Sequence, residues 1–229
     1  MKRVLALTVT VSAMCACVPV AAQTAPGAAE VARYAGLHAA AQRGDIAALQ
    51  QALAAKVDVN ARDGHGRTPL HVATFARQRD VIRALAKGGA DLGALENDRY
   101  DAVTIASVAD DEDTLRLLLE LGASAKLTTS RYDGTALIAA AHLGHDGVVG
   151  QLIAAGAPLD HVNNLHWTAL IESIVLGNGG PRHVATLRAL VQAGASTKLA
   201  DREGRSPLAL AQSRGYGEMV RVLQQAGAR

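Results

Sequence analysis

The sequence predicts an all-α fold: a solenoid of about six helix-turn-helix repeats with projecting hairpin loops. The stretch TALIAAAHLGHDGVVGQLIAAGA, residues 135–157, has the pattern of two short amphipathic helices separated by Gly-His and ended by Gly-Ala. Helices this short cannot bury their apolar faces alone and need neighbours of the same kind. Similar stretches in register along nearly the whole chain supply those neighbours.

The register of the repeat is defined by where each first helix starts and where each second helix stops. The predicted starts are Ala35, Thr68, Asp101, Thr135, Thr168 and Ser206, so the spacing is 33 or 34 residues until a last interval of 38. The predicted stops are Lys56, Gly89, Gly122, Gly156, Gly194 and Gly227. The predicted repeats are therefore about 35–67, 68–100, 101–134, 135–167, 168–205 and 206–229. The fifth repeat carries five extra residues around Gly177 to Pro181.

The second repeat shows the physical logic of one unit. Thr68 is a good N-cap, and Pro69 suits the first helical position because its missing N–H has no intrahelical partner there. Val81, Ile82 and Leu85 follow at helical spacing in the second helix. Gly88-Gly89 stops that helix, and the polar, turn-like residues 91–100 predict a projecting loop.

Some repeats depart from this pattern. The third opens with Asp101-Ala102-Val103-Thr104, so its assignment depends on spacing and on the apolar second helix that follows. Arg99 and His166 occupy the place where other repeats have Gly66 and Gly204. A left-handed backbone at these two residues would cost about 1 kcal/mol each. The first and last repeats carry polar residues suited to terminal repeats that face water.

The N-terminus predicts an export signal. A basic start, Met1-Lys2-Arg3, precedes an uncharged apolar run and the small residues Val20-Ala21-Ala22. Residues 1–22 are therefore interpreted as a signal peptide cleaved after Ala22, and residues 23–33 as a flexible lead-in to a repeat domain at 34–229. This predicts a periplasmic protein. Lipoprotein anchoring through Cys17 is a minor alternative.

Charge and cysteine content exclude several classes of function. Both cysteines, Cys15 and Cys17, lie in the leader, so the remaining chain can form no disulfide and offers no thiol ligand. Without Lys2 and Arg3 the chain has 21 basic and 21 acidic side chains. A balanced chain lacks the basic footprint that nucleic acid or anionic lipid requires, so we expect neither partner, and no membrane contact after cleavage.

Several motifs together resemble ankyrin repeats. They include Thr-Pro-Leu-His at 68–71, Thr-Ala-Leu at 135 and 168, Ser-Pro-Leu at 206, Gly144-His145 and the Gly-Ala stops. The resemblance covers residues 34–228, and the tract 132–182 is similar to exported bacterial ankyrin proteins. The resemblance to ankyrin repeats implies a curved solenoid that holds another protein and has no catalytic activity.

The histidines suggest few chemical sites. His38 and His71 occupy the fourth position of the repeat, where the resemblance implies a hydrogen bond to neighbouring backbone. His142 is predicted to face the groove, but a two-histidine zinc pair needs further ligands and the HExxH spacing is absent. We expect no metal, no cofactor and no enzyme activity.

The predicted binding surface is the concave face of the inner helices together with the hairpin tips. Its central residues are mostly apolar, and each could instead pack between adjacent helices. Glu172 is the one central carboxylate, expected to meet either the backbone of the insertion or a basic group of a partner. Trp167 covers a loop or anchors a partner. The predicted contacts are Val72, Phe75, Ile105, Val108, His142, Leu143, Trp167, Glu172, Val175 and Leu176.

These observations predict a monomeric, non-catalytic interaction scaffold in the bacterial periplasm that binds another protein through its concave groove and hairpin tips. The alternative is a small-ligand or metal-binding protein that uses His142, Glu172 and the glycine-rich insertion.

Overall fold

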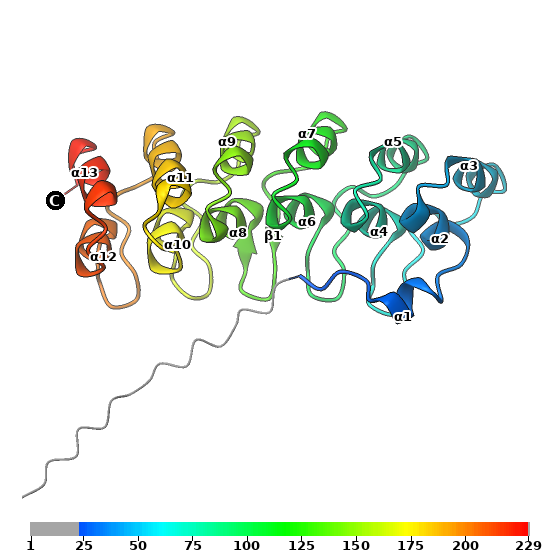
Figure 1. Cartoon of the computed structure of the whole chain (residues 1–229), viewed down its shortest axis with the longest axis horizontal. Helices are drawn as coiled ribbons and strands as arrows, with labels where there is room; N and C mark the ends of the chain where they lie inside the picture. Colours follow the sequence, from blue (N-terminus) through cyan, green and yellow to red (C-terminus); the bar gives the residue numbers. More distant parts are fainter. Residues whose placement is uncertain (1–22, 229) are drawn as a thin grey trace, which may run out of the picture.

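The computed structural model describes residues 23–228 and confirms an all-α solenoid. Two rows of short antiparallel helices run along the molecule, and long loops project from the same edge of every repeat (Figure 1). The predicted signal peptide, 1–22, lies outside the described residues. No helix among the described residues has the length and apolar character needed to cross a membrane.

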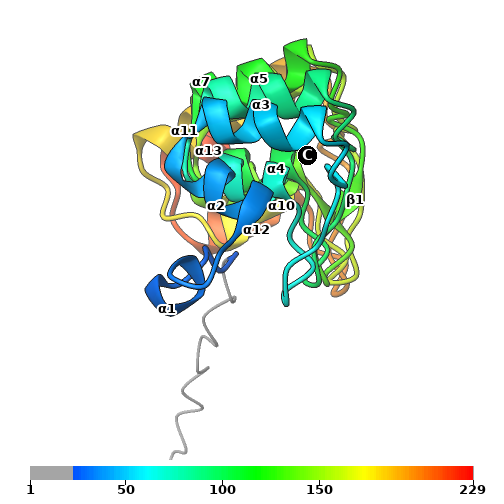
Figure 2. The same cartoon turned by 90° about the vertical axis from the view of Figure 1, so that its right-hand side faces the viewer.

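The inner row carries the loops, and the outer row packs behind it (Figures 1 and 2). A four-residue helix, α1 (Ala28–Val31), precedes both rows. The inner helices are α2 (Gly36–Arg43), α4 (Pro69–Phe75), α6 (Ala102–Val108), α8 (Ala136–Leu143), α10 (Ala169–Val175) and α12 (Pro207–Ser213). The outer helices are α3 (Ile46–Ala54), α5 (Arg79–Lys87), α7 (Glu112–Glu120), α9 (Asp146–Ala154), α11 (Pro181–Gln192) and α13 (Gly217–Gln225).

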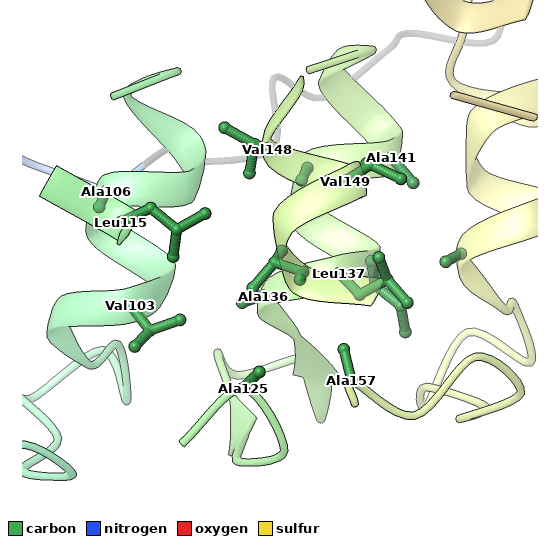
Figure 3. Packing of buried hydrophobic residues seen from close by; sticks show 14 of the residues in the cluster. Val103, Ala106, Leu115, Ala125, Ala136, Leu137, Ala141, Val148, Val149 and Ala157 are labelled. Carbon is green, nitrogen blue, oxygen red and sulfur yellow. The ribbon is translucent and has the colours of Figure 1, made fainter. Parts of the chain in front are cut away.

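The core is continuous from repeat to repeat. Val103 and Leu115 of one repeat belong to the same cluster as Leu137 and Val148 of the next, and all four are almost fully buried (Figure 3). Alanines such as Ala141 allow adjacent inner helices to approach closely. Each repeat therefore buries its apolar faces mainly against its neighbours, which explains why the short helices are stable.

The predicted helix boundaries are confirmed. All six predicted starts are the N-caps of inner helices. In the divergent third repeat, the Asp101 carboxylate accepts a hydrogen bond of 2.8 Å from the Thr104 backbone N–H. All six predicted stops have left-handed backbone, including Lys56 at φ 56°. His166 and Arg99 are left-handed as well, with φ of 63° and 67°.

The hairpins are joined into a rim by backbone hydrogen bonds. Ser130 N–H donates to the Arg99 carbonyl at 2.9 Å, and Asn164 N–H donates to the Tyr132 carbonyl at 3.0 Å. We number each hairpin after the repeat whose inner helix it precedes. The fourth hairpin, before α8, also has a short antiparallel pair, β1 (Thr128–Thr129) with β2 (Gly134–Thr135). These bonds fix neighbouring hairpin tips relative to each other.

Two segments differ from the regular unit. The extra residues of the fifth repeat form a turn and lengthen α11 to 12 residues, against nine in the other outer helices. The segment predicted as a flexible lead-in includes helix α1, which the sequence did not indicate. The Glu30 carboxylate of α1 contacts the Arg67 guanidinium of the second hairpin at 2.8 Å.

Candidate binding groove

A groove with a volume of about 540 Å³ follows the inner helices α6, α8 and α10 and the hairpins that precede them. We call it the aromatic groove because half of the chain's six aromatic side chains line it. Its aromatic lining residues are Tyr100, Tyr132 and Trp167, and its aliphatic ones are Val108, Ile138, Ala139, Leu143, Leu165 and Leu176. Its remaining lining residues are Gln23, Thr104, Thr129, Ser130, Gly134, Thr135, His142, Asn163 and Glu172.

The hairpins outside the groove are closed by an aspartate and an arginine four residues apart. Asp63 Oδ1 accepts hydrogen bonds from the backbone N–H groups of His65 and Arg67, and Oδ2 accepts one of 2.8 Å from Arg67 Nε. Asp201 and Arg205 repeat the arrangement, with an Nε–Oδ2 distance of 2.7 Å. The arginine thus closes the hairpin just before the inner helix.

The fifth hairpin keeps the turn but changes its chemistry. Asn163 replaces the aspartate and still accepts hydrogen bonds of 3.0 Å from the backbone N–H groups of Leu165 and Trp167. Its side-chain nitrogen donates a 2.8 Å hydrogen bond to Glu172 Oε1. Trp167 stands where the second and sixth hairpins have Arg67 and Arg205, and its side chain lines the groove instead of pairing with the side chain of residue 163.

Glu172 is the one carboxylate that lines the groove, and it is only 5% exposed. Burial raises the pKa of its carboxyl from 4.5 to about 7, although the hydrogen bond from Asn163 opposes the shift. His142 Nδ1 lies 3.6 Å from Glu172 Oε2. Burial lowers the pKa of His142, and the neighbouring His183 and His145 lower it further. The low polarity of the site therefore favours the neutral form of both groups.

Six of the ten predicted contact residues line this groove: Val108, His142, Leu143, Trp167, Glu172 and Leu176. Phe75 and Val175 are partly exposed but lie outside it. Val72 and Ile105 are 0% and 1% exposed, so the prediction that they face a partner is wrong. At the fifth position of their repeats, both side chains are buried in the helix packing.

The sequence did not single out Tyr100, Tyr132, Asn163 or Leu165 as groove residues. A signal existed for Tyr100, because it immediately precedes the N-cap Asp101 as Trp167 precedes Thr168. The prediction for Glu172 was also incomplete. Its hydrogen-bond donor is Asn163 of the hairpin, rather than the backbone of the insertion.

The alternative small-ligand site is brought together only in part, because His142 and Glu172 meet in the groove but the insertion does not join them. The insertion, residues 177–181, does not line the groove that holds His142 and Glu172, and the Gly177 carbonyl accepts a 2.9 Å hydrogen bond from the Tyr216 hydroxyl. No group of three or more His, Cys, Asp or Glu side chains among residues 23–228 is arranged to hold a metal ion. His38 and His71 bond to the carbonyls of Arg67 and Tyr100, as the resemblance implied.

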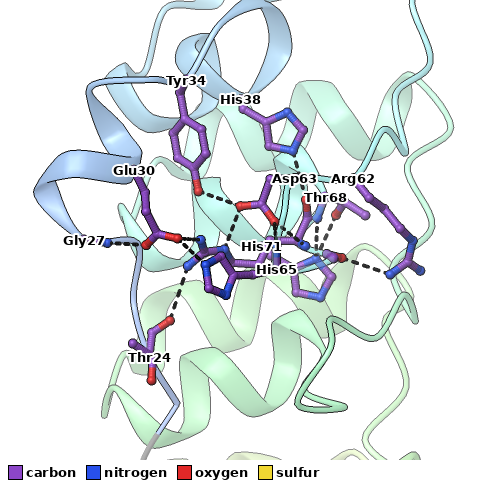
Figure 4. Close-up of polar contacts among 12 residues, drawn as sticks. Thr24, Gly27, Glu30, Tyr34, His38, Arg62, Asp63, His65, Thr68 and His71 are labelled. Atoms are coloured by element: carbon purple, nitrogen blue, oxygen red, sulfur yellow. Dashed lines mark hydrogen bonds and ion pairs between the residues drawn. The ribbon is translucent and has the colours of Figure 1, made fainter.

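An ion-pair network attaches the N-terminal segment to the second hairpin. Arg67, whose side chain is 3% exposed, contacts both Glu30 and Asp63 at 2.8 Å. The Tyr34 hydroxyl donates to the second carboxylate, Asp63, at 2.8 Å (Figure 4). Gln23, at the start of this segment, reaches the aromatic groove and lines it.

Comparison with known proteins gives consistent matches. A family model for ankyrin repeats (3 copies) matches residues 37–129 and 137–229. The putative ankyrin repeat protein YahD of Escherichia coli is 35% identical over 190 residues, which cover 82% of this chain and 94% of YahD.

Solved structures agree with these matches. The crystal structure of an ankyrin repeat domain from Acinetobacter baumannii has a TM-score of 0.80 and 43% identity, covering 84% of this chain and 98% of that one. A structure of a Bdellovibrio bacteriovorus predatory endopeptidase in complex with an immunity protein has a TM-score of 0.67 and 23% identity, covering 84% and 98%. The last likeness concerns the fold alone.

Proposed function

The chain belongs to the ankyrin-repeat family, and from this premise we propose that it is a non-catalytic scaffold that binds a partner protein in the bacterial periplasm. Ankyrin repeats generally mediate protein–protein interaction. The binding surface in this proposal is the aromatic groove with its hairpin rim, and the scaffold acts as a monomer.

One observation carries the proposal: exposed apolar side chains gather at the groove. Five large hydrophobic residues are exposed among residues 23–228, and three of them, Leu143, Leu165 and Leu176, line the groove at 37–40% exposure. Exposed apolar side chains that cluster with aromatic residues are typical of protein contact sites. A partner that covered them would remove apolar surface from water, which favours association.

The periplasmic part of the proposal is supported by the leader-like sequence of residues 1–22. A fusion of these residues to a phosphatase that is active only in the periplasm tests it, together with N-terminal sequencing of the exported product. Activity of the fusion and a new terminus at Gln23 are expected. An inactive fusion that stays in the cytoplasm would refute the proposed location.

The binding part is tested by cross-linking capture from periplasmic extract of the host bacterium. The variant with Leu143→Asp and Leu176→Asp places charge in the groove and should reduce capture of a specific partner by about tenfold or more. Val57→Asp is the matched control, because Val57 is 47% exposed and does not line the groove. Equal capture by the folded double variant and the unchanged protein would contradict the proposal.

A further inference from the structure

We propose that the aromatic groove binds a lysine side chain of the partner, with the alkyl stem between Tyr132 and Trp167 and the ammonium group at Glu172. This inference rests on the proposed function, because the lysine belongs to the partner protein. It goes further by naming the chemical group that the groove recognises.

The walls of the groove suit a cation on an apolar stem. A backbone hydrogen bond brings the hairpins of Tyr132 and Trp167 together. The Tyr132 carbonyl accepts it from the N–H of Asn164, which lies in the same hairpin as Trp167. Both line the same cavity, with Tyr100 farther along it. Aromatic faces attract ammonium groups, and they also pack well against methylene chains.

The floor of the groove offers one carboxylate oxygen that becomes anionic when a cation binds, because a nearby cation favours the ionised form of Glu172. Asn163 occupies Glu172 Oε1, whereas no side-chain donor bonds to Oε2, which lies 3.6 Å from His142 Nδ1. An arginine fork is best matched by two carboxylate oxygens, but a lysine ammonium is a compact point charge that needs only one. A neutral His142 adds a ring nitrogen that can accept a second ammonium hydrogen.

The groove has no cation of its own. None of its lining residues is lysine or arginine, although arginines stand at the corresponding hairpin positions 67 and 205. Replacement of that arginine by Trp167 removes the cation that closes the second and sixth hairpins. The nearby Glu172 supplies a carboxylate that has no lysine or arginine partner in the groove. A buried carboxylate beside aromatic walls is thus complementary to a cation from outside.

The test uses Nα-acetyl-lysine amide as a probe, followed by the fluorescence of Trp167, the one tryptophan of the chain. A saturable change with a Kd in the millimolar range is expected, because a single side chain buries little surface. The arginine analogue should bind more weakly, and the uncharged norleucine analogue should bind weakest. No saturable response to the lysine probe, or an equal response to norleucine, would overturn the proposal.

Variants separate the two parts of the proposed site. Glu172→Gln keeps the hydrogen bond from Asn163 but loses the charge, and should weaken lysine binding about tenfold or more. Tyr132→Leu keeps the fluorescent reporter and should weaken binding about fivefold. Glu120→Gln on the exposed side of α7 is the matched control and should bind like the unchanged protein. Thermal melting of each variant verifies folding, and unchanged binding by folded Glu172→Gln would overturn the assignment.

These experiments distinguish failure of the lysine assignment from failure of the proposed function. If the lysine probe does not bind but the Leu143 and Leu176 variant still loses its partner, the groove is a docking site and the lysine assignment is wrong. Stronger binding of the arginine analogue would likewise overturn the choice of lysine.

Discussion

The side-chain amide of Asn163 donates a 2.8 Å hydrogen bond to the carboxylate of Glu172, which joins the fifth hairpin to the helix that follows it. In the second and sixth hairpins the corresponding aspartate instead holds an arginine of its own hairpin. The identities of this residue and of the one four positions later therefore decide whether the hairpin is closed on itself or supports an acid in the groove.

Asn163→Asp should destabilise the protein by about 1–3 kcal/mol at pH 8, because it replaces a donor with a second carboxylate beside buried Glu172. The loss should be smaller at pH 6, where the two acids can share a proton. Urea unfolding at both pH values measures this loss in the free energy of unfolding. Asn164→Asp, at the exposed neighbour, is the control; it loses an exposed 3.1 Å hydrogen bond to the Arg131 carbonyl and should cost much less than Asn163→Asp. An equal loss at both pH values would contradict the explanation.

Glu172→Gln should make the protein more stable than the unchanged chain at pH 8. The folded-state pKa of Glu172 is raised to about 7 from 4.5, so between these values the folded state binds more protons than the unfolded state. Stability from this group is therefore lost as pH rises from about 4.5 to about 7, up to a limit on the order of 3 kcal/mol.

The measurement is urea unfolding from pH 5 to pH 8 for both proteins. The difference should be small at pH 5 and grow toward pH 8. The titratable or charged side chains nearby are His142 on α8, His183 on α11 and Arg214 at the end of α12, and all are present in both proteins. A difference that does not change with pH would show that burial of the charge is not the cause.

Arg67→Ala should cost about 3 kcal/mol, because it leaves Asp63 and Glu30 without their buried partner. Burial alone would raise the pKa of Asp63, but hydrogen bonds from the Arg67 backbone, Tyr34 and the Arg67 side chain hold it at about 2. The stability that ionised Asp63 contributes is thus fully present above about pH 3.8 and is lost as the pH falls toward 2.

The matched control is Arg205→Ala, because Arg205 makes the same pair with Asp201 but is 52% exposed in its side chain. It should cost much less than Arg67→Ala, because water screens the exposed pair. Thermal unfolding at neutral pH compares the two variants. A cost for Arg205→Ala equal to that for Arg67→Ala would show that burial does not determine the strength of the pair.

His166→Gly should stabilise the protein by about 1 kcal/mol, because glycine adopts φ of 63° without the strain of a side chain. The reciprocal change, Gly204→Ala, places a side chain at φ 76° in the equivalent hairpin, where no atom would obstruct it. It should destabilise by a similar amount. Chemical unfolding of both variants tests the effect, and changes of the same sign would refute it.

Gly177→Ala should destabilise by about 2 kcal/mol, because the new methyl group would lie 2.0 Å from the Ser173 carbonyl oxygen. Gly217→Ala, at the first residue of α13, meets no atom within 4 Å and should be neutral or slightly stabilising. Thermal melting gives both values. A stable Gly177→Ala protein would mean that the turn before α11 can move without cost.

The helical frame was predictable because repeat spacing, N-caps and left-handed stops are local signals that recur. Lys56 shows the strength of the register, since its left-handed conformation follows from position rather than from residue type. The groove was less predictable, because facing water or a neighbouring helix depends on packing between repeats. Ile105 and Val108 lie on one helix, yet the first is buried and the second lines the groove.

Asn163 was missed for a related reason. Its turn-forming role is visible in the sequence, but its bond to Glu172 depends on how the hairpin folds back on α10. Helix α1 was missed in the same way, because the ion pair that attaches it to the second hairpin joins Glu30 and Arg67, which are far apart in sequence.

The Asp–Arg pairs at 63/67 and 201/205 each lie within one hairpin. In the fifth hairpin, Asn163 and Trp167 occupy the same two positions. Exchange of two side chains in such a loop alters what the surface recognises while the helices beneath keep their contacts. Recognition and architecture can therefore evolve separately in this chain, one hairpin at a time, by substitutions that the neighbouring units do not have to match.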